Sequence, residues 1–272
     1  MDSNPIPVRE RRHTGSGHEI ALPKGDVTEG VVRIGDTVRR PHQQQSWAVA
    51  GFLDHLESVG FDGSPRFLGL DAEGRDVLTF LAGDVAGDDV EEWARTDALL
   101  ASLGRFVRRL HEASVGFVPV EPFPPQSVEQ DPVELVAHLD ITPQNTVVRD
   151  GEVVGVVDFD LAGPSTRLID SLNTAMHWVP LRAPEDLRHD ADQFARLRIF
   201  ADAYGWSAEE RAGLAEFAAD RADLSYRRMK LRAETLGGGW ARMWGEGVGD
   251  VIRRRADWLR ANATQLSRQL TT

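Results

Sequence analysis

The 272-residue chain contains no cysteine and only two lysines, Lys24 and Lys230. The missing cysteines exclude disulfides, thiolate metal sites and thiol nucleophiles, and they leave the redox compartment undetermined. The scarce lysines exclude a P-loop, because neither lysine stands in a Gly-Lys-Ser/Thr sequence. Long apolar runs and a charged N-terminal segment leading into one are also missing, so we expect neither a membrane span nor a secretory signal. A cytoplasmic location is the default expectation.

Positive charge is scarce as well, since the formal net charge at pH 7 is −12. Nucleic-acid-binding domains concentrate lysine and arginine to neutralise phosphates, so the balance argues against a nucleic-acid partner. An acidic chain fits a cationic small-molecule partner, and it equally serves solubility. At 30.1 kDa the chain is long enough for one two-lobed unit or two small domains with a sizeable core.

One segment carries a chemical pattern. His138 is followed by Asp140, Asn145 lies five positions after Asp140, and an Asp158-Phe159-Asp160 sequence comes shortly afterwards. Phosphoryl transfer needs a base for the acceptor hydroxyl and oxygen ligands for Mg²⁺, and this spacing supplies both. The pattern predicts Asp140 as the base, and Asn145 and Asp158 as metal ligands. His138 is expected to organise the loop through hydrogen bonds rather than to take part in the chemistry.

A β-hairpin is predicted between the two metal ligands. Two β-branched runs, Thr146–Arg149 and Glu152–Val157, flank an Asp150-Gly151 pair, which is a strong short-range turn signal. A hairpin brings its two ends together. Asn145 and Asp158 are therefore expected to be neighbours, as two ligands of one metal site must be.

The run from Val136 to Asp170, VAHLDITPQNTVVRDGEVVGVVDFDLAGPSTRLID, resembles the signature of the aminoglycoside phosphotransferase and choline kinase family. The usual form is His-Gly-Asp, an asparagine five positions after the aspartate, and Ile-Asp-Trp/Phe-Glu/Asp. The resemblance implies the same roles for Asp140, Asn145 and Asp158, and it gives Asp160 the second acidic position of the metal site. Leu139 replaces the usual glycine, which alters the loop and removes no reactive group.

The resemblance implies an α+β, bilobal protein-kinase-like fold with a small β-rich N-lobe and a larger, mainly helical C-lobe. The N-terminal sequence agrees with this, since residues 30–41 predict two strands joined at Gly35-Asp36 and residues 46–58 predict a helix. The second strand normally carries a phosphate-binding lysine. Strand alternation and alignment with the Ala-x-Lys of kinases select Arg39 for this role, with Thr37 on the same face and Arg40 pointing away.

Other nucleotide-binding features are weaker. Residues 76–81 end at Phe80 and Leu81, which are expected at the hinge beneath the nucleotide base. The helix that usually offers a glutamate to the phosphate-binding residue has Val49 at that position. The stretch from Gly25 to Gly30 contains no G-x-G-x-x-G, and Lys24 is the next candidate anchor if neither arginine serves.

The expected organisation has four parts. Residues 1–19 are expected to be poorly ordered, 20–82 to form the N-lobe, and 83–272 to form the C-lobe, with the catalytic segment at 136–160 and a helical acceptor subdomain at 171–272. A helix is predicted from about 96 to 113, and a proline-rich connection from Pro119 to Pro125. Tryptophans 178, 240 and 244 are candidates for the acceptor site or for the core.

Three classes of function fit the pattern. The first is a kinase that uses Mg²⁺ and ATP or GTP to phosphorylate a hydroxyl of a small molecule, such as an aminoglycoside-like antibiotic, a choline-like amine, an amino acid or a sugar. The second is a nucleotide-binding protein of the same fold without catalysis. The third is a metal-dependent hydrolase with His138, Asp140 and Asp158 as direct ligands.

Overall fold

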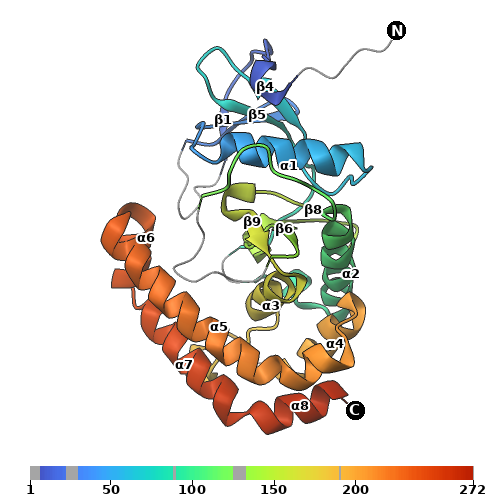
Figure 1. Cartoon of the computed structure of the whole chain (residues 1–272), viewed down its shortest axis with the longest axis vertical. Coiled ribbons are helices and arrows are strands. Elements are labelled where there is room, and N and C mark those ends of the chain that lie inside the picture. The colour runs from blue at the N-terminus through green and yellow to red at the C-terminus, as the bar shows by residue number, and fades with distance from the viewer. Residues whose placement is uncertain (1–6, 23–29, 88–89, 125–132, 190, 272) are drawn as a thin grey trace.

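The structure is a computed structural model that describes residues 7–22, 30–87, 90–124, 133–189 and 191–271. A sheet with one helix beneath it occupies one end of the molecule, and long helices build the other end (Figure 1). The expected α+β class with a β-rich part and a larger helical part is confirmed. No helix in the described ranges has the length and apolar character needed to cross a membrane.

The main sheet has five antiparallel strands in the order β1-β2-β3-β5-β4. They are β1 Ile20–Ala21, β2 Val32–Ile34, β3 Thr37–Arg40, β4 Phe67–Leu70 and β5 Asp76–Thr79. The β2–β3 turn falls at Gly35-Asp36 as predicted, and Gly35 supplies the positive φ of 57° that the turn requires. Helix α1, Ser46–Ser58, has the predicted bounds and buries Phe52, Leu53 and Leu56.

Part of the N-terminal segment also lies on this sheet. Within 7–19, Val8–Glu10 form a short 3-10 turn and Arg12 forms a β-bridge with Leu70. Arg11 pairs with Asp54 of α1. These described residues therefore contact the sheet and α1, which the expectation of poor order for 1–19 did not foresee.

Two small antiparallel strand pairs form the centre of the molecule. One pairs β6, Leu135–Ala137, with β9, Gly163–Ser165, and the other pairs β7, Thr146–Arg149, with β8, Glu152–Val156. Asp150 and Gly151 have φ values of 53° and 77°, as a tight turn with two positive φ values needs. The predicted hairpin is confirmed, and its ends meet where the Val157 N–H donates to the Asn145 carbonyl at 2.8 Å.

Helices surround these strand pairs and form most of the remaining described chain. They are α2 Asp97–Ala113, α3 Arg167–Trp178, α4 Gln193–Tyr204, α5 Ala208–Thr235, α6 Gly238–Gly245, α7 Val248–Ala261 and α8 Ala263–Thr271. In Figure 1, α5 and α7 run side by side, and the end of this pair next to α6 lies level with the central strand pairs. A capping box of Ser207 and Glu210 starts α5 by satisfying backbone donors at its first turn.

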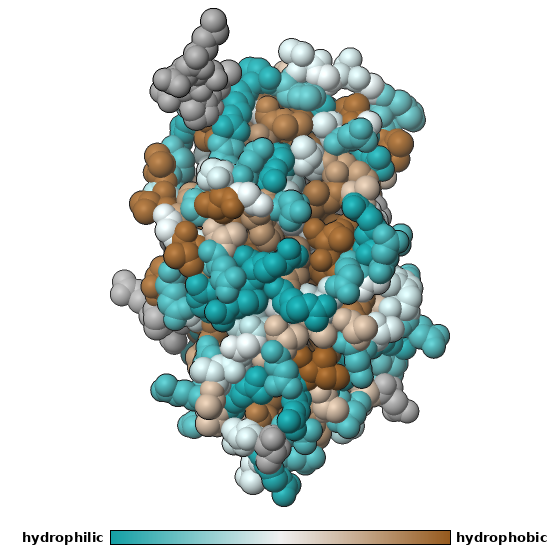
Figure 2. Space-filling view, turned by 90° about the vertical axis from the view of Figure 1, so that its right-hand side faces the viewer, coloured by the Kyte–Doolittle hydropathy of each residue, from teal (hydrophilic) through white to brown (hydrophobic). Residues whose placement is uncertain are grey.

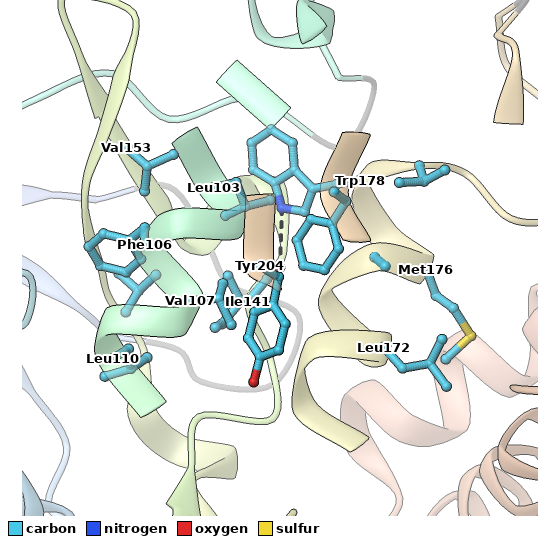
Figure 3. Packing of buried hydrophobic residues seen from close by; sticks show 14 of the residues in the cluster. Leu103, Phe106, Val107, Leu110, Ile141, Val153, Leu172, Met176, Trp178 and Tyr204 are labelled. Atoms are coloured by element: carbon cyan, nitrogen blue, oxygen red, sulfur yellow. Dashed lines mark hydrogen bonds between the residues drawn. The ribbon is translucent and has the colours of Figure 1, made fainter. Parts of the chain in front are cut away.

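A large part of the core lies between α2, α3, α4 and the central strand pairs (Figure 3). Thr96 caps α2 by accepting from the Leu99 N–H, and the helix turns Leu103, Phe106 and Leu110 inward. Each such buried side chain contributes about 1.5–3 kcal/mol by leaving water. The outer face that carries α2 is mostly hydrophilic, with hydrophobic residues in separate groups (Figure 2). Ile141, next to the predicted base, is part of this core.

Candidate active site

The loop between β6 and β7 brings the predicted base and one predicted metal ligand into direct contact. Asp140 follows β6, and Asn145 ends a 3-10 turn that leads into β7. The Asn145 Nδ2 donates to the Asp140 carbonyl at 3.0 Å and to its carboxylate Oδ2 at 2.9 Å. This bond orients the Asp140 carboxylate and leaves the amide oxygen of Asn145 available as a metal ligand.

Asp158 and Asp160 lie just after β8, on the other side of the same hairpin. Asp158 has a left-handed backbone with a φ of 62°, an unusual conformation for a non-glycine residue and one found at functional sites. Its Oδ1 is buried without a hydrogen-bond partner in the described structure, and this atom faces the Arg40 guanidinium at 3.8 Å. An unsatisfied carboxylate oxygen beside further oxygen donors suits a hard cation such as Mg²⁺.

His138 is completely buried and bridges the two sides of the site. Its Nε2 lies 3.0 Å from the Val157 carbonyl, and its Nδ1 accepts from the Asp140 N–H at 3.2 Å. A carbonyl accepts and an N–H donates, so the ring is a neutral tautomer with its proton on Nε2. Desolvation, the largest effect, lowers the pKa of His138 and keeps the ring neutral. The geometry supports the predicted role of loop organiser.

A buried chain of polar groups fixes the residue between His138 and the base. Leu139 has a φ of 65°, and its N–H donates to Asp170 Oδ1 at 2.8 Å. Asp170 Oδ2 binds His111 Nε2 at 2.8 Å, and His111 Nδ1 binds the Tyr204 hydroxyl at 2.8 Å. Burial tends to raise the pKa of Asp170, but the hydrogen bond and charge of His111 outweigh it and the pKa is lowered. The catalytic loop is thereby tied to α2, α3 and α4.

The structure corrects the prediction for the two arginines of β3. Arg39 points away from the catalytic segment and is 1% exposed. Its Nη1 donates to Thr37 at 2.6 Å, its Nη2 donates to the Gly15 carbonyl at 3.1 Å, and its Nε lies 3.6 Å from Asp71. Thr37 shares this face, as alternation requires, so neither predicted nucleotide contact faces the carboxylates of the site.

Arg40 is the arginine that faces the site. It forms an ion pair with Asp160, lies 3.8 Å from Asp158, and lies 3.9 Å from Asp76 of β5. Asp76 stands directly opposite Arg40 in the β3–β5 register and is also bound by His42 and Ser46. It therefore supplies the buried negative charge that the sequence did not place, since position 49 is a valine. Finding it from sequence required the β3–β5 pairing, which only the fold reveals.

The remaining predicted nucleotide contacts lie at the far end of the sheet. Phe80 follows β5, its N–H donates to the Asp36 carbonyl, and the Arg33 guanidinium stacks over its ring at 3.7 Å. Leu81 contacts Gly155 of β8. These residues connect the sheet to the central hairpin, so they stay candidates for the base-binding hinge. Lys24 and the glycine stretch from residue 25 to 29 lie outside the described residues, as does the end of the proline-rich connection after residue 124.

The hydrolase alternative requires His138 as a metal ligand. Both of its ring nitrogens are already engaged by backbone groups, so the ring offers no lone pair to a metal. Among the residues for which coordinates are described, no group of three or more histidine, aspartate or glutamate side chains could hold an ion. The geometry therefore favours a site made of Asn145 and the two aspartates over a histidine-ligated metal.

The three tryptophans predicted near the acceptor fall into two groups. Trp178 is buried in the core, and its Nε1 donates to the Ile141 carbonyl at 3.2 Å, a bond drawn in Figure 3. Trp240 and Trp244 lie on α6 and pack against a small separate core of α5 and α7. Trp178 thus supports the catalytic loop, whereas the α6 tryptophans belong to the helical arm, which α5, α6 and α7 form.

Comparisons with known proteins agree with the sequence. Residues 124–217 match the sequence model of the Phosphotransferase enzyme family. The trifolitoxin immunity protein of Rhizobium leguminosarum bv. trifolii is 29% identical over 213 residues, which cover 73% of this chain and 78% of that protein. The resemblance inferred from residues 136–170 is confirmed.

Solved structures share the fold. A choline/ethanolamine kinase family protein from Mesorhizobium loti has a TM-score of 0.62 at 16% identity, covering 94% of this chain and 93% of that one. Choline kinase from Cryptosporidium parvum Iowa II has a TM-score of 0.58 at 9% identity, covering 93% and 92%. Aminoglycoside 2'-phosphotransferase-IIIa, solved with GDP, has a TM-score of 0.54 at 14% identity, covering 91% and 93%. The likeness shows that this chain shares the fold of these three proteins.

Proposed function

Because the chain has a small-molecule kinase fold with a phosphotransferase sequence signature, we propose that it transfers the γ-phosphoryl group of ATP or GTP to a hydroxyl of a small molecule. The contact between Asp140 and Asn145, across the hairpin from Asp158, carries the proposal. This contact supports the proposal, because phosphoryl transfer requires a base and metal ligands around one point. In this proposal residues 20–82 bind the nucleotide and 83–272 hold the catalytic segment and the acceptor.

The chain's own groups divide the work. Asp140 accepts the proton of the acceptor hydroxyl, and its carboxylate is already oriented by Asn145. Arg40 moves from Asp160 to the nucleotide phosphates, where a guanidinium binds two oxygens at once. Asp76 keeps Arg40 directed toward the site while that exchange takes place. His138 and Asp170 hold the loop backbone at the required place.

The donor set fits Mg²⁺, because Asn145, Asp158 and Asp160 supply oxygen atoms and the Asp158 Oδ1 has no hydrogen-bond partner of its own. When bound there, the ion neutralises phosphate charge. Arg40 supplies positive charge to the same carboxylates. A cation and Arg40 therefore compete for Asp160. A cation bound to Asp160 weakens the ion pair with Arg40 and so favours the binding of Arg40 to phosphate.

The proposal is tested by incubating the protein with Mg²⁺ and ATP or GTP. The acceptor panel contains aminoglycosides, choline-like amines, amino acids and sugars, and mass spectrometry reads a gain of one phosphoryl group. Asp140→Asn is the matched control, because it keeps the shape of the site and removes the base. Nucleotide binding without turnover on any acceptor would favour the alternative of a non-catalytic nucleotide-binding protein of the same fold.

A second candidate is protection against an antimicrobial compound, favoured by the similarity to a trifolitoxin immunity protein. Such protection and phosphoryl transfer are compatible, since a phosphorylated toxin is chemically altered. Expressing the chain in a sensitive host should raise the inhibitory concentration of the compound it modifies. Protection that survives Asp140→Asn would separate the two functions.

A further inference from the structure

The catalytic base has positively charged neighbours on the helical arm. Arg232 of α5 is close enough for its charge to interact with Asp140, and Arg228 stands one turn earlier on the same helix. The pKa of Arg232 is lowered by desolvation first and by Arg228 second, while Asp140 opposes the change. A positive charge therefore lies on the side of Asp140 where α5 approaches the catalytic segment.

A second group of cationic residues lies between α3 and α7. The buried Nε atoms of Arg182 and Arg255 have no hydrogen-bond partner in the described part of the chain. The Arg255 Nη1 lies 4.0 Å from the Met176 sulfur, a weak acceptor. Asp186, the acidic neighbour of both, already forms a bidentate pair with Arg254. Two arginines are thus held close together with little negative charge to balance them.

The charges of this group act on one another. Desolvation and the repulsion from Arg182 lower the pKa of Arg255 to about 10. The charges of Arg255 and Arg182 also act on His177, an exposed residue of α3. His177 precedes Trp178, which binds the residue after Asp140. The arginine pair therefore lies near Trp178, the residue that supports the catalytic loop.

The aromatic faces of the arm are covered by arginine. Arg232 stacks on Trp240 at 4.6 Å, and Arg253 stacks on Tyr226 at 4.3 Å. An aromatic face that already holds a guanidinium cannot also bind a quaternary ammonium group of an acceptor. The arm thus lacks, on these faces, the surface that would attract a choline-like amine.

We propose that the acceptor carries an anionic group, a carboxylate or a phosphate, which Arg182 and Arg255 bind while Arg232 flanks the hydroxyl presented to Asp140. The proposal rests on the phosphotransferase function and narrows its substrate class. It replaces the expectation of a cationic acceptor that the net charge of −12 suggested. Net charge describes the whole surface, whereas recognition depends on the few charges that face the ligand.

Four hexose probes with different charge test the proposal. Glucuronate and glucose 1-phosphate are anionic, glucose is neutral and glucosamine is cationic. Isothermal titration calorimetry should show at least about tenfold tighter binding of one anionic probe than of glucose, as expected when a charged pair is gained, and weaker binding of glucosamine. The two anionic probes distinguish a carboxylate from a phosphate. Equal affinities for all four probes, or a preference for glucosamine, would overturn the proposal.

Variants locate the binding. Arg255→Gln and Arg182→Gln should each remove most of the preference for the anionic probe, while Arg260→Gln should keep it. Arg260 lies on the same helix as Arg255 and pairs at the surface with Asp220 and Asp223. Arg40→Ala should also keep the preference, because Arg40 serves the nucleotide. Loss with Arg40→Ala and retention in both α3–α7 variants would place the anion in the nucleotide site and refute the proposal.

The phosphotransferase function has its own readout in the same samples. Mg²⁺ with ADP should raise the melting temperature of the wild type and of both α3–α7 variants equally. Failure of the nucleotide to bind would reject the proposed function and leave the probe ranking intact. Normal nucleotide binding without a charge preference would reject the acceptor class alone.

Discussion

Exchanging the two neighbouring arginines of β3 for uncharged residues should affect nucleotide binding differently. Arg40 faces Asp158 and Asp160, whereas Arg39 is closed in by Thr37 and Asp71 on the other face of the strand. We expect Arg40→Ala to weaken binding of nucleotide triphosphate and Arg39→Gln to leave it nearly unchanged. Both residues are buried, so binding and folding stability must be measured separately.

The structure sets the size of both effects. Hydrogen bonds to a charged group contribute about 1.5–3 kcal/mol each. Arg40 gains two with phosphate and gives up its bond to Asp160, so its loss should cost about 2–3 kcal/mol, a roughly 30- to 150-fold rise in Kd. Arg39→Gln removes the buried contacts of Arg39 to Thr37, Gly15 and Asp71. Asp71 keeps its ion pair with Arg75, so the free energy of unfolding should fall by about 1–3 kcal/mol.

Urea unfolding measures the stability of each variant, and calorimetric titration with ATP and AMP in the presence of Mg²⁺ measures nucleotide binding. Arg40→Ala should lose affinity for ATP and keep that for AMP, because only the outer phosphates lie within the proposed reach of Arg40. Arg40→Lys should recover part of the loss, since an ammonium retains the charge without bidentate geometry. Weakened ATP binding in the Arg39 variant, with normal binding in Arg40→Ala, would refute the assignment.

Three further results are expected. Asp140→Asn should lower kcat by about 10²–10⁴ with unchanged nucleotide affinity in titration calorimetry, and a loss under tenfold would remove Asp140 as the base. Asp158→Asn should abolish the Mg²⁺-dependent part of nucleotide stabilisation in a melting experiment, and an unchanged shift would exclude it as a ligand. Because the pKa of His138 is lowered in the folded chain, only the unfolded chain binds a proton there below about pH 6.5, so the free energy of unfolding should fall by up to about 1.4 kcal/mol per unit from this residue as pH decreases. His138→Gln should flatten that slope in urea unfolding at pH 7 and pH 5, and an identical slope would show that His138 is not responsible.

The parts of the fold that depend on local sequence could be predicted. Apolar spacing gave the bounds of α1 and nearly those of α2, and the Asp150-Gly151 pair identified the hairpin that brings Asn145 to Asp158. These predictions succeed because turn chemistry and helical periodicity act over a few residues. The ends of that hairpin meet as predicted, since the Val157 N–H, next to Asp158, donates to the Asn145 carbonyl at 2.8 Å.

The parts that depend on distant contacts could not be predicted. Alternation in β3 correctly placed Arg39 and Arg40 on opposite faces, but it does not say which face meets the catalytic segment. Which arginine faces the catalytic segment depends on how the sheet packs against the central strand pairs. Likewise Asp76 lies opposite Arg40 only through the pairing of β3 with β5, and Asp170 meets His111 across 59 positions of sequence. No spacing rule covers such pairs.

The hydrogen bonds that hold the catalytic loop come from a different part of the molecule than the arginines of the proposed acceptor site. Asp170, His111 and Tyr204 anchor the loop to the packed core from below, while the arginines that adjoin the proposed acceptor come from α5, α7 and the segment after α3. We therefore expect substitutions on the helical arm to change the acceptor without displacing Asp140, the proposed base. A laboratory search for new acceptors would do best to vary the arm and keep the Asp170 chain fixed.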